Sequence, residues 1–102
     1  MAETMTDLEK RCVKALRLSV NAGTLLLSEI QSNIEAARAE LLRSGVSATK
    51  VEEEGSLVQN AIIDYVLMQM NDEDQYDRYF NAWQYEMDNL RKSYPQEQEN
   101  EE

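Results

Sequence analysis

Apolar side chains recur every three to four residues along most of this chain, which is the period of an α-helix. The pattern predicts four helices: about residues 7–18, about 24–44, from 56 to a turn at 71–74, and from that turn to about 93. Two glycines and the one proline stand where these helices break, at Gly23, Gly45 and Pro95. The sequence therefore predicts an all-α fold, a small bundle of about four helices in one domain over residues 1–94.

Signals for helix ends accompany this pattern. Thr6 and Glu9 have the spacing of a capping box, as do Asp72 and Gln75. Gly45 follows the second helix, where a left-handed residue commonly ends one. We also expect Ser56 to cap the third helix, and residues 45–55 to form a connection that is pinned to the core by Val46 and Val51.

The predicted core comes from the apolar stripes of these helices. The third helix is apolar on nearly all sides over residues 61–68, which is typical of a central helix. The fourth carries an aromatic-rich seam with spacings of three and four residues, and its simplest interpretation is core. The residues expected in the core are Leu16, Ile30, Ile34, Leu41, Ile62, Val66, Phe80, Trp83 and Met87.

The charge is strongly acidic, with 20 acidic and 10 basic residues and a net charge of −10. An excess of this size argues against a protein that wraps nucleic acid by neutralising phosphates. Four of the acids fall in residues 95–102, which have no apolar side chain, so we expect a disordered acidic tail there. The remainder of the chain keeps 16 acids against 10 bases and is only moderately acidic.

Candidate chemistry is sparse. The chain has no histidine and one cysteine, so the commonest general base at neutral pH, the commonest transition-metal ligand and a disulfide framework are all missing. Cys12 lies on the apolar face of the first helix and is expected to be a small core residue. The acids at 52–54 and 72–74 fit solvated turns better than a calcium loop. We therefore expect an intracellular protein that is not an enzyme, needs no cofactor or metal, and does not enter a membrane.

Contacts with other molecules are the remaining possibility. Lys10, Lys14 and Arg17 line one face of the first helix, either as a solvated face or as a contact for an acidic partner or a phosphate. Several apolar and aromatic residues lie off the main stripes, and a small bundle cannot bury them all. The candidate subunit or partner interface is therefore Lys10, Lys14, Arg17, Leu27, Ile63, Leu67, Tyr79 and Tyr85.

Several short stretches of the predicted helices form a pattern that runs over residues 8–94. They are Ile34-Glu35-Ala36-Ala37-Arg38, Leu42-Arg43-Ser44-Gly45-Val46, Ala61-Ile62-Ile63-Asp64-Tyr65 and Asp77-Arg78-Tyr79-Phe80. In these stretches and in the order and spacing of its helices, the chain resembles the head–tail connector (head completion or adaptor) proteins of tailed phages of the siphophage type and related prophages. Two segments depart from that family, since residues 19–24 lack its acidic turn and the tail after Tyr94 has no counterpart in it.

The resemblance implies a structural virion protein at the head–tail interface, made in the host cytoplasm. It implies a homo-oligomeric ring of about twelve subunits in which each subunit presents two different surfaces to its neighbours. The ring would bind the portal protein on one side and a tail-side stopper or completion protein on the other. DNA would pass through its channel without sequence-specific binding. The alternative is a small acidic helical regulator or inhibitor that binds a single host protein.

Overall fold

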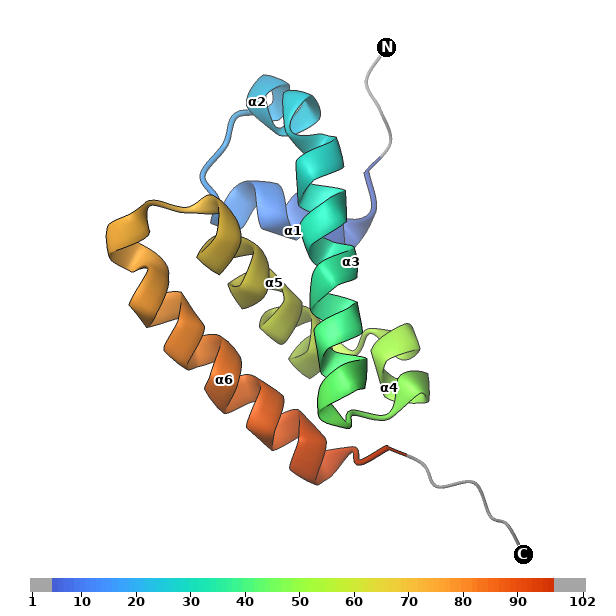
Figure 1. Ribbon diagram of the computed structural model, residues 1–102. Coiled ribbons are helices and arrows are strands. Elements are labelled where there is room, and N and C mark those ends of the chain that lie inside the picture. Colours follow the sequence, from blue (N-terminus) through green and yellow to red (C-terminus); the bar gives the residue numbers. More distant parts are fainter. Residues whose placement is uncertain (1–4, 97–102) are drawn as a thin grey trace, which may run out of the picture.

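The computed structural model describes residues 5–96, and the predicted all-α class is confirmed. The described residues contain no strand, and a single isolated bridge joins Val46 to Pro95. The helices are α1 (Asp7–Ala15), α2 (Val20–Leu25), α3 (Leu27–Ser44), α4 (Ala48–Glu53), α5 (Ser56–Met70), a 3-10 turn η1 (Glu73–Gln75) and α6 (Tyr76–Ser93) (Figure 1).

The prediction of about four helices was wrong in number, because two segments expected to be connections fold into the short helices α2 and α4. The side-chain oxygen of Ser19 accepts a hydrogen bond from the backbone N–H of Ala22 at 3.1 Å and caps α2. Ser47 caps α4 in the same way through Lys50. Serine three residues before a free N–H is the cap signal that reveals such short helices.

The helix ends agree in part with the sequence prediction. The Thr6–Glu9 capping box is present at α1, and Gly45 adopts the left-handed conformation, with φ 107°, after α3. However, α1 ends at Ala15 rather than near residue 18, and no side-chain hydrogen bond caps η1. Ser56 is the first residue of α5 and not its cap, a position that Gly55 occupies.

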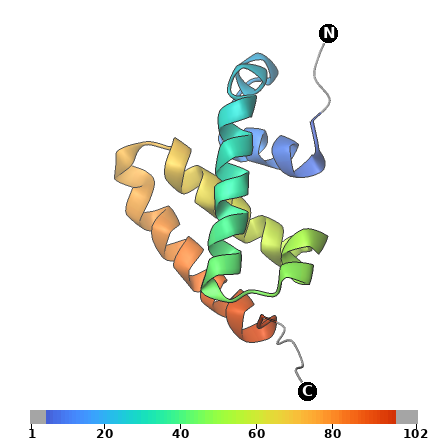
Figure 2. The same ribbon diagram turned by 45° about the vertical axis from the view of Figure 1, so that its right-hand side comes forward.

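The helix α5 occupies the centre of the molecule, as its apolar sequence predicts. It packs against α1, α3 and α6, and α6 returns beside it as an antiparallel neighbour (Figure 1). The helices α3 and α6 converge where both end and separate toward α2, which is visible in both views (Figures 1 and 2). At the converging end, Tyr94 O accepts a hydrogen bond from Ser47 N–H at 2.8 Å, and Gly45 O accepts one from Gln96 N–H at 2.7 Å.

These two hydrogen bonds also correct the expected start of the tail. Pro95 and Gln96 are paired with the segment after α3 and do not begin a free tail. The remaining part of the predicted acidic tail, residues 97–102, lies outside the described residues. Val46 and Val51 are buried, as expected of residues that pin the connection after α3 to the core.

Six of the nine predicted core residues are buried: Ile30, Ile34, Leu41, Ile62, Val66 and Trp83. Leu16 and Met87 are half-buried and pack against the edge of the core. Phe80 was predicted wrongly, because it is 37% exposed. The reason is the divergence of α3 from α6: near its start, α6 is covered by α5, and one neighbouring helix buries only a narrow stripe.

Candidate functional site

The eight residues predicted for an interface divide into exposed and buried groups. Lys10, Lys14 and Arg17 are exposed on and just after α1. Tyr85 is 69% exposed on α6, whereas Tyr79 is half-buried against the core, with the guanidinium of Arg78 lying 5.5 Å from its ring centroid. The structure does not bring the basic face of α1 and these tyrosines into one site.

The expectation that Leu27, Ile63 and Leu67 form surplus surface was wrong. All three are buried within this single chain. Ile63 and Leu67 lie on α5, which has helices on several sides, so its off-stripe residues also find partners. Leu27 begins α3 next to the unpredicted α2, and the additional helix changes what surrounds that position.

Other apolar residues are exposed instead; of these, sequence reasoning had named Leu25 as an off-stripe residue that favours self-association, but not Val20, Tyr76 or Phe80. On α2, Leu25 is 83% exposed and Val20 is also exposed. On α6, Tyr76 and Phe80 are exposed although the seam pattern placed them in the core. The signal that could have found the α2 pair is the cap at Ser19, because a short helix with apolar residues at both ends cannot bury them all. The remaining large exposed apolar residues are Leu42 and Leu57.

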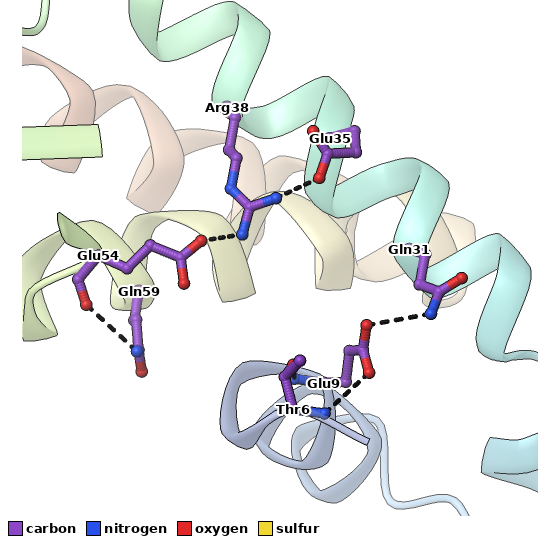
Figure 3. Close-up of polar contacts among 7 residues, drawn as sticks. All are labelled: Thr6, Glu9, Gln31, Glu35, Arg38, Glu54 and Gln59. Carbon is purple, nitrogen blue, oxygen red and sulfur yellow. Dashed lines mark hydrogen bonds and ion pairs between the residues drawn. The ribbon is translucent and has the colours of Figure 1, made fainter. Parts of the chain in front are cut away.

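A polar network ties α3, the end of α4 and α5 together on one side of the molecule (Figure 3), and Arg11 extends it to α1. Arg38 of α3 forms ion pairs with Glu35 of the same helix and with Glu54, which follows α4. The backbone carbonyl of Glu54 accepts a hydrogen bond from the Gln59 amide of α5 at 3.2 Å. Arg11 of α1 donates to Gln59 Oε1 at 2.6 Å, so the network continues to the first helix.

One member of this network, Glu54, has a left-handed backbone conformation. Its φ is 52°, a conformation that glycine adopts more readily, yet the chain places Gly55 one residue later. The carboxylate of Glu54 is largely buried and forms an ion pair with Arg38. An open groove of about 500 Å³ lies beside it between α3 and α4, with Leu42 on its rim. The groove holds carboxylates and one paired arginine, a set that fits structural support better than catalysis.

A second polar feature lies between α5 and α6. One carboxylate oxygen of Glu86, Oε1, is buried and receives no hydrogen bond from a donor within residues 5–96. Its neighbour is the carboxyl of Asp64, and two such groups can share a hydrogen bond only when one holds a proton. Burial, the hydrogen bond to Asp64 and the charge of Asp64 raise the pKa of Glu86 to about 8. The raised pKa favours the protonated form of Glu86, in which one carboxyl of the pair can donate to the other.

Cys12 is fully buried in the core, as predicted. Burial raises the pKa of its thiol to about 11, so the group is protonated at neutral pH and is a poor nucleophile. Within the described range, three or more potential metal ligands do not gather at any point. None of the helices formed by residues 5–96 has the length and hydropathy to cross a membrane.

Comparison with known proteins adds no relative: no family model, curated protein or solved structure matches this chain. The candidate site is therefore defined by the chain itself. It consists of the exposed basic face of α1 and the exposed apolar residues of α2 and α6.

Proposed function

We propose that this chain is a structural protein of the head–tail connector of a tailed phage, not an enzyme. It forms a homo-oligomeric ring under the portal protein, extends the channel through which DNA passes, and docks a tail-side stopper or completion protein. The resemblance over residues 8–94 supports this proposal, and its short matching stretches fall on α3, α5 and α6.

The observation that carries the proposal is the exposure of large apolar residues on two different elements. Leu25 and Val20 are exposed on α2, and Tyr76, Phe80 and Tyr85 are exposed on α6. In a cyclic ring each subunit uses one surface toward one neighbour and a different surface toward the other. Exposed side chains on separate elements can give such a subunit different faces for its two neighbours.

The charge supports the same proposal. Carboxylates exceed basic groups by ten over the whole chain. A channel subunit with that balance repels phosphates on average, so DNA can slide past without being retained by counterion release.

The test is the assembly state of the purified full chain. Sedimentation velocity and mass photometry over a wide concentration range, with and without a phage portal oligomer, measure ring formation directly. Negative-stain electron microscopy then counts the subunits, and we expect about twelve. A strict monomer that neither forms rings nor binds the portal would contradict the proposal.

The alternative function, a small regulator or inhibitor of a single host protein, gives a different result in the same experiment. It predicts a monomer that binds one host protein with one-to-one stoichiometry and ignores the portal. A regulator of this kind would also keep its exposed residues on one contiguous face, and not on two separate helices.

A further inference from the structure

The start of α6 carries an exposed aromatic pair. The rings of Tyr76 and Phe80 stack with their centroids 5.9 Å apart and an interplanar angle of 13°, and they are 42% and 37% exposed. They lie one helical turn apart, so both present a ring on the same side of α6. Exposed carboxylates surround this pair in the sequence. We call the whole set the aromatic-acidic surface: Asp72, Glu73, Asp74, Tyr76, Asp77 and Phe80.

The chemistry of this surface selects a cationic partner with aliphatic arms. The faces of aromatic rings attract ammonium and guanidinium groups, and the neighbouring carboxylates add charge attraction. Lysine stems also cover apolar surface while their ammonium groups stay at the rim. Arg78, the one base in this segment, lies over the ring of Tyr79 instead. The surface therefore fits a row of lysines better than a purely apolar helix.

The same chain carries such a row. Lys10 and Lys14 lie one turn apart on α1, and Arg17 follows the helix; all three are exposed. None of them forms an ion pair with another residue of the range 5–96. The helix α1 packs against α5 and α3, and α6 is not among the helices with which it has extensive contacts. The basic face of one copy is therefore open to the aromatic-acidic surface of another copy.

We propose that the basic face of α1 in one copy docks on the aromatic-acidic surface of the next copy. This inference rests on the ring assembly proposed above and specifies its subunit contact. The lysine stems lie across the Tyr76 and Phe80 rings, and their ammonium groups pair with Glu73 and Asp77. Because the contact joins two different surfaces, it is head-to-tail and can continue around a ring.

Charge reversal in the full-length chain tests this contact. The first variant is Lys10→Glu with Lys14→Glu, and the second is Glu73→Lys with Asp77→Lys. Each should raise the concentration at which rings form by at least about tenfold, because like charges then face each other. Circular dichroism melting shows whether each variant is folded.

An equimolar mixture of the two variants provides the decisive measurement. Every junction in an alternating ring of the two again joins opposite charges, so the mixture should assemble as the wild type does. The matched control for the first variant is Arg43→Glu with Lys92→Glu, which makes the same change in net charge at exposed positions outside both surfaces and also removes the Arg43–Glu40 ion pair. This control should retain wild-type assembly.

The outcomes separate the two proposals. If each charge-reversed variant forms rings normally by itself, or if their mixture fails to restore assembly, the proposed α1–α6 contact is wrong. The proposal that the chain forms a ring would still stand. Loss of assembly in the control variant to the same extent would also overturn the contact, because the effect would then be one of net charge. A wild-type chain that never assembles, even with the portal, overturns the ring and the contact together.

Discussion

The carboxyl pair between α5 and α6 makes the stability of this protein depend on pH, and Glu86→Gln tests that dependence. In the folded chain the pKa of Glu86 is raised from 4.5 to about 8, so the folded state holds a proton that the unfolded state releases. This group therefore favours folding fully below about pH 4.5, and the benefit is lost as the pH rises through 8. Glutamine cannot titrate, and its amide donates to Asp64 at every pH.

The magnitude follows from the size of the shift. If the whole pKa shift of Glu86, from 4.5 to about 8, contributed to the free energy of unfolding, it would correspond to about 5 kcal/mol. Glu86 is only half-buried, and solvent screening reduces the expected effect to about 1–2 kcal/mol. The free energy of unfolding of Glu86→Gln should therefore exceed that of the wild type by a margin that grows by this amount between pH 5 and pH 9.

Urea denaturation followed by circular dichroism at several pH values gives this margin directly. Asp64→Asn should also flatten the pH dependence, because it removes the charge that faces Glu86. The exposed Glu52→Gln is the matched control, and its margin over the wild type should not change across the same range. Parallel stability curves for the wild type and Glu86→Gln from pH 5 to pH 9 would refute the reasoning.

Two further predictions concern packing. Gly23→Ala should lower the free energy of unfolding by about 1–2 kcal/mol, because the added Cβ would lie 2.9 Å from both methyl carbons of Val13 and this crowding outweighs the gain in helix propensity. In a Val13→Ala background, urea denaturation should show the loss removed, and an undiminished loss would contradict the steric cause. Trp83→Ala should lower the free energy of unfolding by about 3–5 kcal/mol in the same assay. The indole ring is buried edge-on against the ring of Tyr65, with the two ring centroids 4.9 Å apart. Tyr85→Ala should change the free energy of unfolding by less than about 0.5 kcal/mol, because Tyr85 is exposed. Equal losses in Trp83→Ala and Tyr85→Ala would contradict the assignment of Trp83 to the core and Tyr85 to the surface.

The sequence by itself determined the fold class, the long helices and most of the core. Helical periodicity is a local property, so the stripe of α3 and the all-round apolar character of α5 were enough to predict Ile34 and Ile62 as buried. Caps formed within one turn were equally accessible, as Thr6 with Glu9 and the left-handed Gly45 show.

Only the tertiary structure decided which side of each helix has a neighbour. The seam of α6 looks uniform in sequence, yet Trp83 is buried against Tyr65 of α5 whereas Phe80, one turn earlier, is exposed. The pairing of Asp64 with Glu86 was also invisible, since it depends on the register between two helices. Periodicity identifies the apolar side of a helix, but the crossing of helices determines how much of that side is covered and which residues remain for other molecules.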